Sequence, residues 1–335
     1  MILRHPLYTV PCVSDTGMSM GIALYTFYKR QQCFDFKLRG AFYGDSDKRD
    51  LLEVIKAANM SQFIKSIHPL DLNIIVDDII DYPIVWFDEK AEIGPRALGH
   101  RCLIADARYI KSKDILNRIK QRQWWRPVAP IVDYKFADMY FDNVYFSPYM
   151  LHTFNIKTEY SKDIHAICHI DNSARIQTAD NSIGRLYEVV KSYEAYTNIP
   201  LLCNTSLNDK GEPIINKIEE ALDFALRKQI PIVYINGSRL ELHNFSNYTK
   251  EIPFKRNNTF DQWLSESEIN DWKEKLNPYN LPFIYIQMYI LEEGLHMFRL
   301  ENEKDVKLLK NIIDKLLINE QTRRWIESGV MYLNK

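Results

Sequence analysis

The chain has 335 residues, of which 46% are hydrophobic and 26% are charged, and its formal net charge is -1 at pH 7. This composition excludes collagen-like, low-complexity and disordered chains, and the balanced charge argues against a protein that binds nucleic acid through its overall charge. Only 11 residues are glycine, about 3% against a usual share of about 7%, so each glycine is expected where the backbone needs a positive φ or must approach a ligand.

The cysteines and the apolar segments bear on the cellular compartment. Five scattered cysteines without a CxxC pair or a zinc spacing predict reduced thiols. The first residues contain no apolar h-region, so no secretory signal is expected, and no apolar run approaches the roughly 18–20 residues of a membrane span. We therefore expect a cytoplasmic protein without a membrane partner.

The first 60 residues are predicted to be the end of a larger domain. An apolar run at 10–13 predicts a buried strand, 14–17 predicts a turn and 18–28 predicts a helix. No preceding strand could complete a domain with these elements, so the rest of that domain is expected elsewhere.

Residues 61–245 alternate predicted strands and helices, which is typical of an α/β or α+β domain. Strands are predicted at 83–87, 199–203 and 231–235, extended chain at 164–177, and helices at 114–121, 186–196 and 218–228. On the first of these helices, Ile115, Leu116 and Ile119 share one face.

Residues 246–335 have a different pattern. Two apolar runs, at 283–291 and 296–300, flank a Glu-Glu-Gly turn and predict a β-hairpin. An amphipathic helix is predicted at 305–317, and a final helix follows it. This region is expected to be a small α+β accessory module.

The segment 92–101 is predicted to be a loop that is shaped by two glycines and a proline, and it contains two arginines. Arg96 and Arg101 each carry a planar fork of donors that suits a phosphate or a carboxylate. A turn that merely carries two surface arginines explains the pattern equally well.

A basic stretch runs from Arg108 to Arg126, with seven basic residues and one acid. On a helix, Asn117 and Lys120 are three residues apart and share a face, and Arg122 follows just beyond. Two tryptophans precede Arg126, so the stretch suits either nucleic acid or the phosphates of one nucleotide, and the neutral total charge favours the nucleotide. A solvated helix face with two packed tryptophans is the third interpretation.

Short polar side chains follow the strand predicted at 199–203. Asn204 and Ser206 are in the position where α/β sheets usually contact ligands, although such residues also cap helices and form turns. Asp15 follows the first predicted strand; a single carboxylate there can bind a metal, but a simple turn is the better-supported interpretation.

His165 and His169 have the spacing of a helical metal-binding pair. Their apolar neighbours predict a strand, in which side chains four residues apart are separated by roughly 13 Å. We therefore expect no shared metal, although His169 can still reach a ligand by itself.

Together these stretches resemble the carbamoyltransferase family that includes the nodulation and antibiotic O-carbamoyltransferases. The resemblance covers about residues 6–245. The matching stretches are Glu92-Ile-Gly-Pro-Arg-Ala-Leu-Gly-His-Arg101 with 103–106 and Arg108, then 117–130, 147–151, 169–177, 204–206 and 211–213. It implies a YrdC-like twisted mixed sheet with flanking helices at 61–245, preceded at 1–60 by the tail of a Kae1-like, actin-like ATPase-type domain.

The resemblance also implies a reaction. A YrdC-like domain forms carbamoyl-adenylate from carbamoyl phosphate and ATP with Mg2+, and a Kae1-like domain transfers the carbamoyl group to a hydroxyl. The residues implied to be catalytic are Lys120, Arg126, Arg175 and Ser206. Those implied to bind substrate are Arg96, Arg101, Asn117, Arg122, His169 and Asn204. Asp15 matches a ligand of Fe2+ or a similar divalent metal in the Kae1-like site.

The sequence departs from the family pattern at its beginning. Only 14 residues precede Asp15, so the two histidines expected to complete the metal site are absent. The resemblance therefore implies a separate Kae1-like subunit that completes the enzyme. A non-catalytic nucleotide-binding remnant is the alternative. The acceptor is expected to be the hydroxyl of a small molecule, or else a hydroxymethylated nucleobase in DNA or a nucleotide.

Overall fold

The computed structural model describes residues 10–31 and 38–249. The α-helices in these ranges are α1 (Met18–Gln31), α2 (Leu51–Ala57), α3 (Leu72–Asp81), α4 (Ile110–Ile119), α5 (Tyr134–Tyr140), α6 (Arg185–Thr197) and α7 (Ile218–Arg227). The strands are β1 (Ile64–Pro69), β2 (Ile84–Phe87), β3 (Arg101–Ala105), β4 (Ala129–Asp133), β5 (Thr153–Asn155), β6 (Ser173–Arg175), β7 (Gln177–Ala179), β8 (Leu201–Ser206), β9 (Ile232–Ile235) and β10 (Ser238–Leu242). The hairpin and helices predicted within 246–335 lie outside the described residues.

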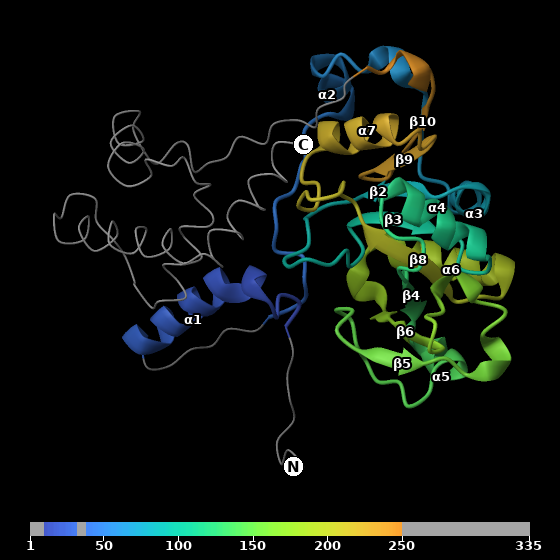
Figure 1. The fold of residues 1–335 in the computed structure, drawn as a ribbon. Helices are drawn as coiled ribbons and strands as arrows, with labels where there is room; N and C mark the ends of the chain where they lie inside the picture. The colour runs from blue at the N-terminus through green and yellow to red at the C-terminus, as the bar shows by residue number, and fades with distance from the viewer. Residues whose placement is uncertain (1–9, 32–37, 250–335) are drawn as a thin grey trace, which may run out of the picture. The chain divides into compact units, whose positions relative to one another are not determined.

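Strands that are far apart in the sequence meet in one eight-stranded sheet with the order β1-β10-β9-β2-β3-β8-β4-β7 (Figure 1). The pairs β2–β9 and β4–β7 are parallel, and the other neighbours are antiparallel. β5 and β6 form a separate antiparallel pair. The protein is thus a mixed α/β fold with a large mixed sheet and flanking helices, as the sequence predicts.

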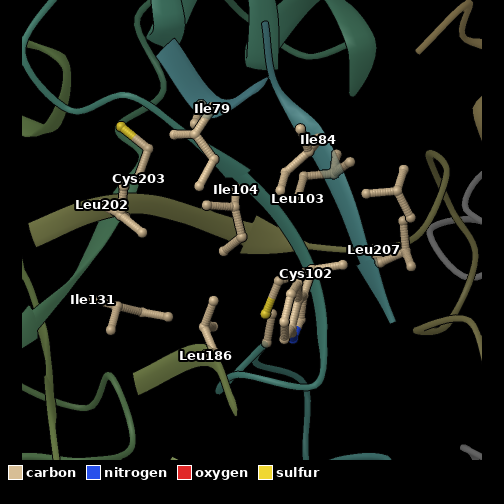
Figure 2. Packing of buried hydrophobic residues seen from close by; sticks show 14 of the residues in the cluster. Ile79, Ile84, Cys102, Leu103, Ile104, Ile131, Leu186, Leu202, Cys203 and Leu207 are labelled. Atoms are coloured by element: carbon tan, nitrogen blue, oxygen red, sulfur yellow. The ribbon is translucent and has the colours of Figure 1, made fainter. Parts of the chain in front are cut away.

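The core lies on both faces of the central strands. Every residue of β2, β3 and β4 is buried, which explains why these strands, apart from Arg101 and Asp133 at two of their ends, are apolar without the alternation of a half-exposed strand. Figure 2 shows Ile79 of α3 and Leu186 of α6 among the buried side chains of the central strands. The N-cap of α3 is Asp71, whose carboxylate accepts hydrogen bonds from the amides of Asn73 (2.8 Å) and Ile74 (3.2 Å).

The sheet brings three loops to one edge. Ser206 at the end of β8 pairs with Cys102 at the start of β3, and Asn204 of β8 pairs with Ala129 at the start of β4. The loop before β3, the loop before β4 and the loop after β8 therefore emerge side by side. These are the three loops that carry most of the residues singled out by the sequence.

Several sequence predictions are confirmed with small shifts of boundary. The helices expected at 18–28, 186–196 and 218–228 are α1, α6 and α7, and the strands expected at 83–87, 199–203 and 231–235 are β2, β8 and β9. The helix expected at 114–121 is α4, which begins earlier, at Ile110, and ends at Ile119. Leu116 and Ile119 are buried as predicted, whereas Ile115 is half-buried.

Two predictions are wrong. Residues 10–13 form a turn that leads into a 3-10 helix, η1 (Asp15–Gly17), because burial of Cys12 comes from packing against a loop and not from pairing in a sheet. The extended chain expected at 164–177 begins with another 3-10 helix, η4 (His165–Ile167), and only then forms β6 and β7. The apolar residues of η4 are buried without strand pairing. Within the described ranges, no helix has the length and apolarity needed to cross a membrane.

Candidate functional site

A cavity of about 510 Å³ opens at the sheet edge where the three loops meet. Its lining comes from the loop before β3, the end of α4 and the loop that follows it, β6, and the end of β8 with the loop after it. Of the residues predicted from the sequence, the cavity brings together Arg96, Lys120, Arg122, Arg126, Arg175, Asn204 and Ser206. The catalytic roles remain predictions, but these side chains share one site.

The cavity is strongly basic. Its lining contains the basic side chains of Arg96, Lys120, Arg122, Arg126, Arg175 and Lys210. The single acidic side chain among the described lining residues is Asp209, which forms ion pairs with Arg227 (2.7 Å) and Lys228 (2.9 Å). Since that carboxylate is already paired, the cavity keeps an excess of positive charge and suits a polyanion.

Lys120 joins the end of α4 to the end of β8. Its side chain is buried, and Nζ donates hydrogen bonds to the carbonyl oxygen of Ser206 (2.7 Å), to the carbonyl of Asn208 and to Oδ1 of Asn208 (2.5 Å). Burial, and then repulsion by Arg122, lower the pKa of Lys120 to about 7. An anion close to Nζ would favour the charged form of this lysine.

Two arginines of the cavity are also held away from water. Burial lowers the pKa of Arg122 to about 10, with a further contribution from Arg126. The pKa of Arg175 is lowered to about 10 in the same way, with contributions from Arg96 and Arg122. Within the part of the chain that the structure describes, Nε of Arg175 is buried and has no hydrogen-bond partner. A buried donor without a partner is costly, and an anion in the cavity would relieve this cost.

Asn117 supports the site from behind and does not line the cavity. Its Nδ2 donates to the carbonyl oxygens of Trp124 (2.9 Å) and Arg126 (3.0 Å), and its Oδ1 accepts from Nε of Arg122 (2.5 Å). The buried amide is therefore occupied by the turn that follows α4. Asn117 is not among the residues that line the cavity, so its predicted ligand-binding role stays a prediction, and within the site it contacts Arg122.

Arg101 likewise serves the fold. The residue is fully buried, and its guanidinium lies 3.6 Å from the ring centroid of Phe87. It donates to the carbonyl oxygens of Asp88, Glu89 (2.9 Å) and His100 (3.2 Å). Its Nε is buried without a partner among the described residues, and Arg101 is not among the residues that line the cavity, so the predicted ligand-binding role stays a prediction.

Glu92, which was not predicted as a site residue, organises the loop that carries Arg96. Its Oε1 accepts hydrogen bonds from four consecutive backbone amides, those of residues 98–101, at 2.7, 3.0, 2.8 and 3.1 Å. The residue is buried, with 8% of its surface exposed. One carboxylate oxygen therefore closes the loop, with Arg96 near its apex. The sequence signal was present, since an acid begins the motif, but its partners are backbone groups that leave no side-chain pattern.

The same loop is tied to the strands beneath the cavity. Nδ2 of Asn204 donates to the carbonyl oxygen of Ala97 (2.9 Å), and Nε2 of Gln177 donates to that of Leu98 (2.6 Å). Asn204 thus lines the cavity and also anchors the loop. Asn208, a second residue missed as a site candidate, accepts hydrogen bonds at Oδ1 from both Lys120 and the Ser206 hydroxyl (2.6 Å). Its place in the polar run after β8 was the available signal.

Two predicted residues lie away from the cavity. His169 is half-buried, and its Nδ1 is 3.1 Å from the Ser173 hydroxyl; burial lowers its pKa. Asp15 is exposed in η1. Across residues 10–31 and 38–249, no group of three or more His, Cys, Asp or Glu side chains could hold a metal ion. His165 and His169 do not lie on one strand, since the first is in η4.

Comparison with known proteins gives consistent matches for this region. Residues 78–241 match the family model described as Carbamoyltransferase C-terminus. Nodulation protein U of Sinorhizobium fredii (strain NBRC 101917 / NGR234) is 44% identical over 130 residues, which are 38% of this chain and 23% of that protein. The 3'-hydroxymethylcephem-O-carbamoyltransferase of Amycolatopsis lactamdurans is 28% identical over 218 residues, which are 64% of this chain and 40% of that protein.

The chain thus spans well under half the length of these curated relatives. Among solved structures, full-length HypF in its phosphate- and nucleotide-bound form aligns with 48% of this chain and 21% of its own, at 18% identity and a TM-score of 0.34.

Proposed function

This chain belongs to the carbamoyltransferase family through its residues 78–241, and from this premise we propose that it is a subunit of an ATP-dependent O-carbamoyltransferase. The subunit would form carbamoyl-adenylate from carbamoyl phosphate and ATP. The observation that carries the proposal is the basic cavity, in which the cations Lys120, Arg122 and Arg175 converge on one space. Transfer of phosphoryl and adenylyl groups depends mainly on positioned positive charge and needs little covalent chemistry from the protein.

The proposed reaction has three steps. Carbamoyl phosphate is hydrolysed to carbamate and inorganic phosphate. A carbamate oxygen attacks the α-phosphorus of ATP, the bond from that phosphorus to the bridging oxygen breaks, and pyrophosphate leaves with the electron pair. The acceptor hydroxyl later attacks the carbamoyl carbon, AMP leaves and the hydroxyl proton passes to solvent.

The side chains of this chain have distinct tasks in the proposal. Arg122, Arg126 and Arg175 hold the phosphates and offset the charge that develops on the leaving pyrophosphate. Lys120 exchanges its hydrogen bonds with carbonyl oxygens for bonds to phosphate and becomes fully charged. The hydroxyl of Ser206 and the amide of Asn204 orient the ligand at the end of β8.

A second polypeptide is proposed for the transfer step. Asp15 would be one ligand of Fe2+ or a similar divalent metal, and the described residues supply no cluster to complete that site. We propose that a separate Kae1-like subunit supplies the remaining ligands and binds the acceptor. The intact basic cavity argues against a non-catalytic remnant.

The proposed acceptor is a small-molecule hydroxyl. One observation favours a hydroxymethylated nucleobase as the second candidate: Trp124 and Trp125 beside Arg126 are 74% and 50% exposed, and exposed rings next to cations can stack on bases. Binding of DNA would then weaken steeply with salt. A salt-insensitive acceptor affinity would favour the small molecule.

Adenylate formation by the purified full chain tests the proposal. With ATP and carbamoyl phosphate, we expect pyrophosphate release, and we expect Arg126→Ala and Arg175→Ala to lower it at least about 100-fold with an unchanged melting temperature. Arg118→Ala removes an exposed arginine of α4 outside the cavity lining and serves as the matched control. Carbamoylation of an acceptor should require addition of the Kae1-like chain. Absence of both nucleotide binding and pyrophosphate release would overturn the proposal.

A further inference from the structure

The side chains that line the cavity do not suit a magnesium ion bound by the protein itself. Mg2+ is usually bound through one or two carboxylates together with substrate phosphates. Asp209 is the sole carboxylate among the lining residues in the described ranges, and both of its oxygens are paired, Oδ2 with Arg227 at 2.7 Å and Oδ1 with Lys228 at 2.9 Å. Recruiting Asp209 to a metal would leave Lys228 without this ion pair and Arg227 with Asp223 alone.

The basic side chains that line the cavity already supply the positive charge that a metal ion would provide. Lys120 is repelled by Arg122 and attracted more weakly by Asp209 and Glu212. Arg122 is repelled by Arg126, and Arg175 is repelled by both Arg96 and Arg122. None of these five basic side chains forms an ion pair with any described residue. A divalent cation among them would add to this repulsion, whereas a polyanion would relieve all of it.

The guanidinium of Arg175 also favours an anion. Beside the buried Oδ1 acceptor of Asn204, which also lacks a partner among the described residues, the lining holds the buried Nε donor of Arg175, which only an acceptor atom can satisfy. A phosphate oxygen is such an atom. A metal ion is not, because a guanidinium has no lone pair to coordinate it.

From these observations we propose that the cavity takes its polyphosphate ligand as the metal-free anion, with fixed guanidinium and ammonium groups in the place that Mg2+ occupies at carboxylate-lined phosphate sites. The inference rests on the proposed function for the identity of the ligand, and it specifies the charge state that the site selects. Free pyrophosphate carries more negative charge than its magnesium complex, so the free form should bind about ten-fold more tightly or better.

Calorimetric titration of the full chain with inorganic pyrophosphate tests this inference. One titration contains a chelator and the other contains saturating MgCl2, with ionic strength matched by NaCl because screening alone weakens charge interactions. We expect magnesium to weaken binding. The inference is overturned if magnesium strengthens binding or leaves the dissociation constant unchanged.

A matched pair of variants ties the effect to the cavity. Arg122→Gln removes one wall charge, so the difference between free and magnesium-bound pyrophosphate should shrink. Arg118→Gln makes the same change in charge on the exposed face of α4 and should leave the ratio of the two dissociation constants as it is in the natural chain. An equal effect of both variants would assign the preference to overall charge and would contradict the inference.

The same titrations separate this inference from the proposed function. If neither form of pyrophosphate nor ATP binds, the proposed function fails. If the ligands bind only as magnesium complexes, the proposed function stands and the charge-state inference alone is wrong.

Discussion

Nζ of Lys120 lies 2.7 Å from the carbonyl oxygen of Ser206, so the residue that caps α4 is hydrogen-bonded to the residue that ends β8. These two residues are 86 positions apart in the sequence. They meet because β8 lies between β3 and β4, which places the loop before β4 beside the loop after β8. A ligand that takes Nζ away from this carbonyl would therefore be sensed by both loops.

The first prediction concerns the pH dependence of anion binding. Lys120 has its pKa lowered to about 7, so its charged form is complete only below that pH, and the anion affinity should fall as the pH rises through about 7. Sulfate is the suitable probe because its own charge is constant in this range. Calorimetry between pH 6 and about 9 should show this decline. Lys120→Arg keeps its charge throughout, so its affinity should be nearly flat; an equal decline in both proteins would contradict the prediction.

The second prediction separates two arginines of one loop. Arg101→Met should lower the free energy of unfolding by about 3 kcal/mol, because the buried guanidinium no longer donates to the carbonyl oxygens of Asp88, Glu89 and His100, of which the last still accepts from the amide of Asp88. Arg96→Met should leave stability nearly unchanged and weaken binding of pyrophosphate. Urea unfolding and calorimetry together measure both effects. A stable Arg101→Met protein with weakened binding would restore Arg101 as a ligand contact.

The third prediction tests whether Glu92 acts through Arg96. Glu92→Gln keeps an acceptor oxygen but removes the charge that strengthens four hydrogen bonds to residues 98–101, so we expect a loss of about 2 kcal/mol in stability and a weaker affinity for pyrophosphate. In the double variant with Arg96→Met, the affinity should be no weaker than in Arg96→Met alone. Additive losses of binding free energy in this double-mutant cycle would show that Glu92 does not work by holding Arg96.

The fourth prediction uses a matched pair of glycines. Gly94 has φ +97°, and an added Cβ would lie 2.8 Å from the carbonyl oxygen of Pro11. Gly94→Ala should therefore cost about 1–3 kcal/mol and loosen the contact of the segment 10–17 with the loop before β3. Gly21 lies within α1, and no described atom lies within 4 Å of an added Cβ, so Gly21→Ala should be neutral or stabilising by up to about 1 kcal/mol.

Thermal melting measures the stability of both glycine variants, and limited proteolysis reports the contact at the N-terminal segment. Faster cleavage before residue 40 is expected for Gly94→Ala only. If Gly94→Ala melts like the natural protein and resists cleavage equally, Pro11 does not pack on this loop in solution.

The sequence predicted those helices and strands whose buried residues recur at regular positions within one segment. The periodic faces of α6 and α7 and the apolar run of β9 could be assigned from sequence because each pattern is contained in a single segment. Residues 10–13 show the limit of this reasoning. Their apolar character reflects burial against the loop around Gly94, and a strand requires a hydrogen-bonding partner that this segment does not have among the described residues.

The sequence by itself determined the family resemblance, the alternation of strands and helices, and the set of basic and polar motifs from which the cavity is built. Only the tertiary structure decided which members of that set line the cavity. Arg96 and Arg101 are five residues apart, yet the start of β3 buries Arg101 against Phe87 while Arg96 lines the cavity. The side-chain amide of Asn117 donates its hydrogen bonds to backbone carbonyl oxygens of the following turn. Whether such a residue lines the cavity depends on the positions of carbonyl and amide groups in distant loops. These positions cannot be predicted from the residue type alone.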